Sequence, residues 1–192
     1  FLNQIVTEGG EYRPDQILNQ LREKIIKSLD NKDQEIQARD GMDLALCRLD
    51  KESMQLEYAG ANNSLWIVRE GDNYEPREGE RKFNLTDSKH ELIEILADKQ
   101  PVGSYGDFLK SFNTKSIQLK KQDRIYTFSD GYADQFGGDK GKKMKPKTLK
   151  TILLKTRNES LSTQRETLLQ SLNAWKKDFE QVDDICIVGV EI

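Results

Sequence analysis

The sequence has 192 residues, a length that predicts one domain with a sizeable core. Its 30 basic and 33 acidic side chains give a net charge of -3, which argues against a nucleic-acid partner because such proteins carry basic surfaces. No run approaches the roughly 20 apolar residues of a membrane span, and the first residues lack the basic flank and cleavage pattern of a signal peptide.

Few residues carry redox or histidine-based chemistry. Cys47 and Cys186 each lie in an apolar run, so we expect both to be small buried side chains in strands. Unpaired cysteines of this kind are typical of a reducing compartment, which predicts a cytoplasmic location. His90 is the single histidine, and this argues against a His-rich zinc site. A catalytic centre would have to use carboxylates, a hydroxyl or a thiol.

The start of the chain is predicted to be helical. Phe1–Val6 has the character of the last turns of a helix that stops at two glycines, so we expect the domain to be incomplete at its N-terminus. A proline then opens a second helix over Pro14–Leu29. Its apolar residues recur every four positions and form one stripe: Ile17, Leu21, Ile25 and Leu29.

From Met42 onward the pattern changes to short strands. Leu44–Cys47 is nearly all apolar, which predicts a strand covered on both faces. Together with Gln55–Ala59 and Leu65–Val68 it predicts an antiparallel meander, and Tyr74–Pro76 would add a short strand after a turn. Two more strands are expected further along the chain, at Lys115–Leu119 and Arg124–Phe128.

Helices are expected again near the C-terminus, over Pro146–Lys155 and Thr163–Phe179. The closing apolar run Ile185–Val190 predicts a buried strand. Strands followed by helices and a returning strand predict a single α+β domain over residues 1–192, with helices layered on antiparallel sheet.

Acidic residues stand at three of the predicted strand ends. Asp130 follows one strand within a Ser-Asp-Gly triplet, Asp183 and Asp184 precede the closing strand, and Asp40 and Asp43 flank an earlier strand start. An ordinary turn explains each acid on its own. Together, carboxylates with almost no histidine favour a site for Mg²⁺ or Mn²⁺. Two such ions can activate a water and neutralise a phosphoryl group.

At these residues the sequence resembles the metal-dependent protein serine/threonine phosphatases of the type 2C superfamily, and most of all their bacterial sporulation-type branch. The last two matching segments are the most specific, because both their order and their separation follow the family. In chain order the matching segments are Asp40–Cys47, Tyr58–Asn63, Lys99–Gly103, Arg124–Gly131 and Val182–Val190.

The resemblance implies an antiparallel β-sandwich flanked by helices, with two ions, Mn²⁺ or Mg²⁺, at one end. It implies that Asp130 and Asp183 bind metal directly and that no side chain acts as a further catalytic group beyond the metal-activated water. Four residues are expected around these ligands without binding metal themselves: Gly131, Asp184, Asp40 and Asn63. The family's N-terminal Asp strand and Asp-x-Thr-Gly-His-Gly-type segment have no counterpart in the sequence, so we expect about half of the metal ligands.

The function implied by the resemblance is hydrolysis of phosphoserine or phosphothreonine on a protein substrate, by a water activated between two divalent ions, in signal transduction of the partner-switching type. The alternative is an incomplete phosphatase fold that binds a partner or oligomerises, since part of the ligand set is missing. We also expect an upstream sensory or regulatory domain in the parent chain. An open sheet edge would favour a homodimer or swapped assembly.

Overall fold

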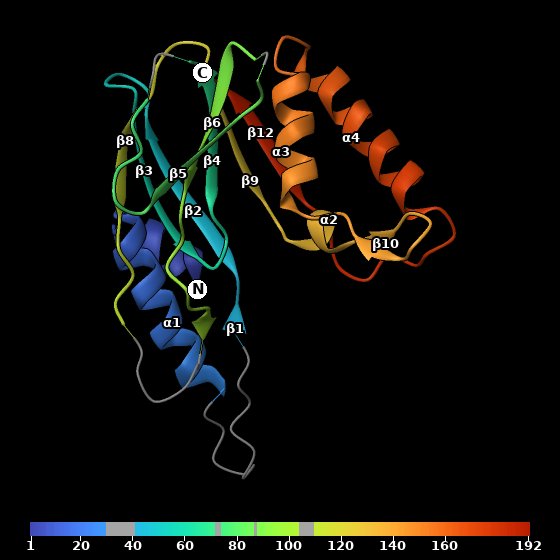
Figure 1. Cartoon of the computed structure of the whole chain (residues 1–192). Helices are drawn as coiled ribbons and strands as arrows, with labels where there is room; N and C mark the ends of the chain where they lie inside the picture. Colours follow the sequence, from blue (N-terminus) through green and yellow to red (C-terminus); the bar gives the residue numbers. More distant parts are fainter. Residues whose placement is uncertain (30–40, 72–73, 87, 104–109) are drawn as a thin grey trace. The chain divides into compact units, whose positions relative to one another are not determined.

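The computed structural model describes residues 1–29, 41–71, 74–86, 88–103 and 110–192. These residues form two compact units, each built from two separate segments of the chain (Figure 1). The first unit is Phe1–Ser64 with Leu96–Leu119, and the second is Leu65–Ile95 with Lys120–Ile192. The expectation of one domain over residues 1–192 stays a prediction.

The first unit is built around the long helix near the N-terminus. Helix α1 spans Pro14–Leu29, as predicted, and its proline has the fixed φ that suits a first helical turn. The side chains of Ile17, Leu18 and Leu21 are buried against Ile5 of the short π-helix η1 (Gln4–Glu8). Burial of one such side chain stabilises the fold by about 1.5–3 kcal/mol, so this stripe anchors the helix.

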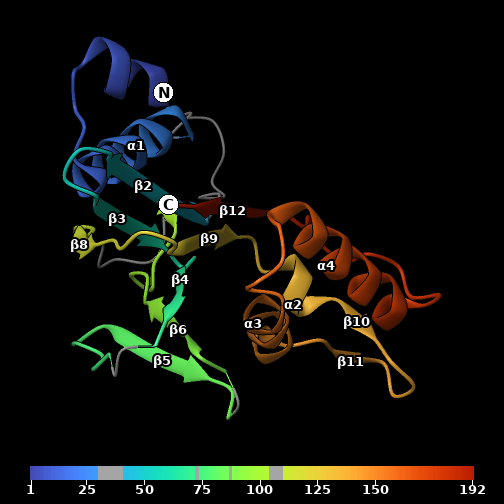
Figure 2. The same cartoon turned by 90° about the horizontal axis from the view of Figure 1, so that it is seen from above.

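A small antiparallel sheet lies against α1 (Figure 2). Within the described ranges it has three strands in the order β2-β3-β8, which span Leu44–Asp50, Gln55–Ala61 and Lys115–Gln118. A short additional ladder joins β1 (Gly41–Met42) to β7 (Val102–Gly103). The strands β3 and β8 confirm the predicted runs at nearly their predicted bounds.

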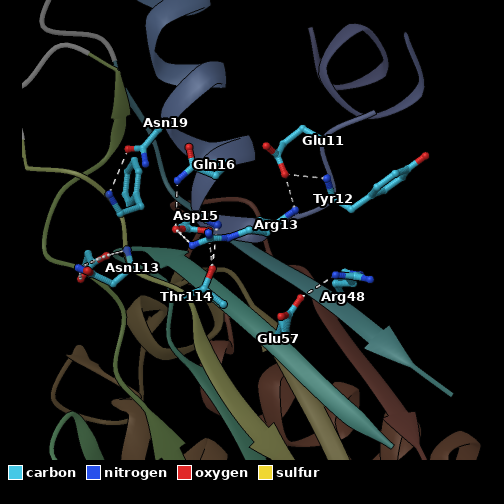
Figure 3. Close-up of polar contacts among 12 residues, drawn as sticks. Glu11, Tyr12, Arg13, Asp15, Gln16, Asn19, Arg48, Glu57, Asn113 and Thr114 are labelled. Atoms are coloured by element: carbon cyan, nitrogen blue, oxygen red, sulfur yellow. Dashed lines mark hydrogen bonds and ion pairs between the residues drawn. The ribbon is translucent and has the colours of Figure 1, made fainter. Parts of the chain in front are cut away.

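Polar contacts fix the start of α1 to the segment before β8 (Figure 3). Thr114 Oγ1 accepts a hydrogen bond from the backbone N–H of Asp15 at 3.0 Å and donates one to Asp15 Oδ1 at 2.8 Å. Arg13 pairs with Asp15 Oδ2 at 2.8 Å. Burial raises the pKa of Asp15, but the hydrogen bonds from Thr114 and Arg13 outweigh it and hold that pKa below its ordinary value of 3.8.

Two predictions for this part of the chain are wrong. The expected meander does not form, because β3 pairs with β8 on its far side and the next strand, β4 (Leu65–Glu70), belongs to the second unit. Strand β2 is not covered on both faces either: it runs from half-buried to exposed, and Cys47 is exposed. Among the described residues β3 is its only strand partner in this sheet, so β2 is an edge.

The second unit contains a larger antiparallel sheet. In the part of the chain that the structure describes, its five strands have the order β12-β9-β4-β6-β5. The register places Tyr126 of β9 between Gly189 of β12 and Trp66 of β4. The strands of this sheet not yet given bounds are β5 (Glu80–Asn84), β6 (His90–Ile95), β9 (Arg124–Phe128) and β12 (Ile187–Glu191).

Helices cover one face of this sheet. Helix α3 spans Pro146–Lys155, as predicted, and α4 spans Leu161–Lys176, with the Ser160 side chain accepting the Thr163 N–H at its start. Their apolar residues pack on the sheet in one core that includes Trp66, Tyr126, Leu149, Leu153 and Leu168. The short helix α2 (Gly131–Asp134) and the hairpin of β10 (Phe136–Gly137) and β11 (Lys142–Lys143) connect β9 to α3.

The second unit also departs from the predicted pattern. Tyr74–Pro76 forms no strand; β5 lies further along at Glu80–Asn84 and pairs with the unpredicted β6. The closing strand β12 is not buried, since Val188 and Val190 are 50% and 43% exposed and Cys186 before it is also exposed. Within the described residues β12 pairs with β9 alone, so it too is a sheet edge. Elements and sheets nonetheless confirm the α+β class with antiparallel strands.

Across the described ranges, no helix is both long and apolar enough to cross a membrane.

Candidate active site

The antiparallel pairing of β9 with β12 brings two predicted acids to the same end of one sheet. The ladder pairs Phe128, the last residue of β9, with Ile187, the first residue of β12. Asp130 follows the first of these residues and Asp183 precedes the second, so the two acid-bearing segments leave the sheet side by side. Two strand ends far apart in sequence therefore meet because of strand direction alone.

A serine hydroxyl ties these two segments together. Ser129 Oγ donates to the backbone carbonyl of Asp184 at 2.7 Å and accepts from the backbone N–H of Cys186 at 2.9 Å. The Ser129 N–H also donates to the Cys186 carbonyl at 2.9 Å, which extends the ladder beyond the last assigned pair. One side chain thus satisfies a donor and an acceptor of the opposite segment, and the Asp183–Asp184 turn is held beside Asp130.

Gly131 allows the segments to approach this closely. A Cβ atom at this position would lie 2.4 Å from the backbone oxygen of Asp184, a distance that no side chain tolerates without a shift of backbone. The glycine is therefore required by packing between the two acid-bearing segments. This gives a physical reason for the Asp-Gly pair that the sequence alone left open as an ordinary turn.

The two carboxylates are both exposed but differ in how they are held. Asp130 occupies the N-cap position of α2, yet its side chain does not cap the helix. Asp183 Oδ1 accepts from the backbone N–H of Asp184 at 2.7 Å, and Gln181 Nε2 donates to the Asp183 carbonyl at 2.8 Å. The Asp183 hydrogen bond uses one of its two carboxylate oxygens and orients the group.

The described acids are the type of ligand that a hard divalent cation prefers, but they are too few to fill its coordination sphere. Carboxylate oxygens are the ligands that Mg²⁺ and Mn²⁺ prefer, and such ions take six or so oxygens. Among the described residues no group of three or more His, Cys, Asp or Glu side chains gathers in a way that could hold an ion. Asp130 and Asp183 would thus supply part of a coordination sphere.

The remaining predicted site residues are spread over the chain. The carboxylate of Asp184 is exposed, and it is the backbone of this residue that contacts Ser129 and Gly131. Asn63 lies after β3 in the first unit, where its carbonyl accepts from the Tyr58 hydroxyl at 2.6 Å. Asp40 lies outside the described residues. The roles assigned to these residues stay predictions.

Sequence reasoning missed Ser129. The triplet Ser-Asp-Gly drew attention to its acid, while the serine had no expected partner because Cys186 lies 57 positions away. The available signal was a hydroxyl at a strand end next to an acid, a residue type that often bonds local backbone groups.

Two exposed ion pairs join the hairpin that follows α2 to its neighbours, one to the end of α2 and one to the end of α4. Asp134 pairs with Lys143 at 2.6 Å, and Asp139 pairs with Lys177 at 2.6 Å. The hydrogen bond from Lys177 lowers the pKa of Asp139, and the same bond raises the pKa of Lys177.

A model of one protein family, stage II sporulation protein E (SpoIIE), matches residues 2–192. The chain belongs to the SpoIIE family. This confirms the resemblance to the sporulation-type branch of the type 2C phosphatases. A comparison with curated proteins finds no match.

Solved structures agree on the fold of this SpoIIE-family chain. The SiaA-PP2C domain of Pseudomonas aeruginosa superposes with a TM-score of 0.77 at 20% identity, over 100% of this chain and 65% of that one. RsbX in complex with magnesium gives a TM-score of 0.58 at 12% identity, over 98% and 69%. The PP2C domain of SpoIIE from Bacillus subtilis, solved with a fragment of its regulatory domain, gives 0.53 at 18% identity, over 92% and 49%.

These likenesses show a type 2C phosphatase fold. The chain spans 65% of the length of the SiaA domain, somewhat less than two thirds.

Proposed function

We propose that the protein containing this chain removes phosphate from phosphoserine or phosphothreonine on a protein substrate, with Mn²⁺ or Mg²⁺ as cofactor. The observation that carries the proposal is the Ser129 bridge, which fixes the turn of Asp183 beside Asp130 at one end of a sheet. Membership of the SpoIIE family and the type 2C phosphatase fold support the reaction class. The magnesium in the RsbX complex supports the kind of ion.

Within this scheme, Asp130 and Asp183 hold the cations through carboxylate oxygens. A pair of bound divalent ions would activate water and neutralise the charge of the phosphoryl group. The task of the chain itself is geometric: Ser129 and Gly131 keep the two acid-bearing segments in contact, so the negative charges stay in one place when no ion offsets their repulsion.

We propose the substrate and the cellular setting by analogy with the family. A phosphorylated regulatory protein is the proposed substrate, and a regulatory domain in the parent chain is the proposed source of control, as in the SpoIIE of Bacillus subtilis, whose solved PP2C domain is accompanied by a fragment of a regulatory domain. We place the reaction in the cytoplasm, in signal transduction by partner switching. A homodimer through an open sheet edge also remains part of this proposal.

The alternative function is that of a phosphatase-fold module that binds a partner or oligomerises without turnover. It is favoured by the small donor set, because two acids satisfy only part of the coordination of two ions. One assay distinguishes the phosphatase from the binding module.

The assay is dephosphorylation of a phosphoserine protein by the full-length parent with Mn²⁺. Asp130→Asn and Asp183→Asn should each lower the rate at least about a hundredfold, since loss of several kcal/mol of charge stabilisation corresponds to that factor. Asp139→Asn is the matched control, because Asp139 is an exposed acid on the hairpin that pairs with Lys177 at the end of α4. Its rate should stay within about twofold of the wild-type rate. Unchanged rates in both site variants would rule out Asp130 and Asp183 as metal ligands, and a parent without turnover would favour the binding module.

A further inference from the structure

A basic pocket lies at the end of the large sheet opposite to the two acids. It encloses about 290 Å³ and is bounded by the start of β6, the end of β4 and the turn before β9. Strand β9 runs from this pocket to Ser129, and a five-residue strand spans about 17 Å. The pocket is thus separate from the candidate active site, and it lies wholly within the second unit.

Positive charge exceeds negative charge among the described residues that line this pocket. They include four basic side chains and two acids, a surplus of two, with His90 beside them. One acid, Asp123, is 1% exposed and already accepts hydrogen bonds from Arg69 Nε at 3.1 Å and from the Lys120 backbone N–H at 2.9 Å. The four basic side chains are Arg69, Lys120, Lys121 and Arg157.

Hydrogen-bond donors also exceed acceptors behind the pocket. Arg157 is 8% exposed and donates to the carbonyl of Gln122, while Glu191 is shared between Arg157 at 3.6 Å and Arg124 at 2.6 Å. Within the described residues, Nε of Arg157, which lines the pocket, and Nη1 of Arg124, which does not line it, are buried without a hydrogen-bond partner. Buried guanidinium groups with unmet donors favour an anion nearby.

The pKa of His90 is lowered by burial and by the positive charges near this pocket. Burial lowers the pKa of His90 first, and the charges of Arg157, Arg124 and Lys89 lower it further against the opposing effect of Glu70. An anion in the pocket would oppose this lowering of the His90 pKa, because it stabilises the charged imidazolium.

We propose that this pocket binds a phosphate group. Its volume is large enough to admit a tetrahedral oxyanion together with water, and its lysine and arginine donors are those that bind phosphate oxygens in proteins. A neighbouring cavity of about 820 Å³ shares Glu70, His90 and Gln122 with the pocket and adds Lys89 and Lys155. The phosphate can thus be free or can belong to a small monoester whose organic part enters this second cavity. The proposal is independent of the proposed phosphatase activity.

The test follows the His90 C2 proton by NMR in the whole 192-residue chain, where the resonance needs no assignment because the sequence has one histidine. Samples contain no divalent ion, and NaCl keeps the ionic strength constant. Inorganic phosphate should raise the pKa of His90 by about half a unit or more, because a nearby anion stabilises the imidazolium form. O-phosphoserine serves as the monoester probe, and the probe that acts at the lower concentration identifies the source.

Matched variants distinguish a site from a general charge effect. Lys121→Glu should weaken phosphate binding at least about tenfold, since it places a negative charge at the pocket. Lys147→Glu makes the same charge change at an exposed position at the start of α3 and should leave the binding constant within about twofold. The proposal is overturned if neither probe shifts the His90 pKa, if NaCl alone gives the same shift, or if both variants weaken binding equally.

Discussion

Removal of the Ser129 hydroxyl tests how the candidate active site is assembled. Ser129→Ala deletes the hydrogen bonds to the Asp184 carbonyl and from the Cys186 N–H. Each bond contributes about 1 kcal/mol net, and the exposure of Cys186 lets water replace part of the loss, so we expect destabilisation by about 1–2 kcal/mol. For a domain of this size that corresponds to a fall in Tm of about 2–8 °C.

Calorimetric melting and a Mn²⁺ titration of the same samples supply the two readouts. Ser129→Ala should lower the Tm and weaken Mn²⁺ binding, because the Asp183 turn is no longer tied beside Asp130. Ser129→Thr retains a hydroxyl and should keep most of the wild-type Tm and Mn²⁺ affinity. Ser162→Ala replaces an exposed serine in the first turn of α4 and should change neither the Tm nor the Mn²⁺ affinity. A Ser129→Ala protein that melts lower yet binds Mn²⁺ as tightly as wild type would refute the positioning role.

Two further predictions concern packing and pH. Gly131→Ala should destabilise the chain by about 1–3 kcal/mol and lower phosphatase activity of the parent, because its Cβ would meet the Asp184 carbonyl at 2.4 Å. Urea melts of wild type and Gly131→Ala measure this loss, and an unchanged midpoint would contradict the packing role of the glycine. Thr114→Val should raise the pKa of Asp15 toward 3.8, since a bond to its charged form is lost. The Asp15 carboxylate has a lowered folded pKa, so its stabilising contribution is complete above about pH 5 and is lost as pH falls through that pKa. The difference in Tm between wild type and Thr114→Val should therefore be larger at about pH 6 than near pH 2, where only the lost hydrogen bond from the Asp15 N–H still contributes, and a constant difference would contradict this reasoning.

Local pattern was sufficient for elements whose side chains alternate clearly between core and solvent. The bounds of α1 and α3 match their predictions because each has an apolar periodicity that the fold uses directly. The bounds of β9 also match, although its residues are buried or half-buried throughout. Strand β6 escaped prediction since it includes His90, Glu91 and Glu94, yet Glu91 is 5% exposed in the folded chain. Its strand state comes from pairing with β4 and β5, and such pairing leaves no local signal.

Burial was the property that sequence pattern misjudged most. The runs at β2 and β12 are apolar enough for covered strands, but both lie at sheet edges among the described residues. Edge position depends on which strands join the sheet, and this is fixed by tertiary topology rather than by the residues of the strand itself. The same limit explains the site: Asp130 and Asp183 were identified by family resemblance, while their meeting follows from an antiparallel ladder and a serine hydroxyl.

The central claim is that Asp130 and Asp183 hold divalent cations at one shared site. Substoichiometric Mn²⁺ added to the isotope-labelled chain broadens the amide resonances closest to the ion, even when binding is weak. Ser129–Gly131 and Asp183–Ile185 should broaden together, and either Asp130→Asn or Asp183→Asn should remove the broadening from both segments. Broadening of one segment without the other, or unchanged broadening in the variants, would contradict a shared site.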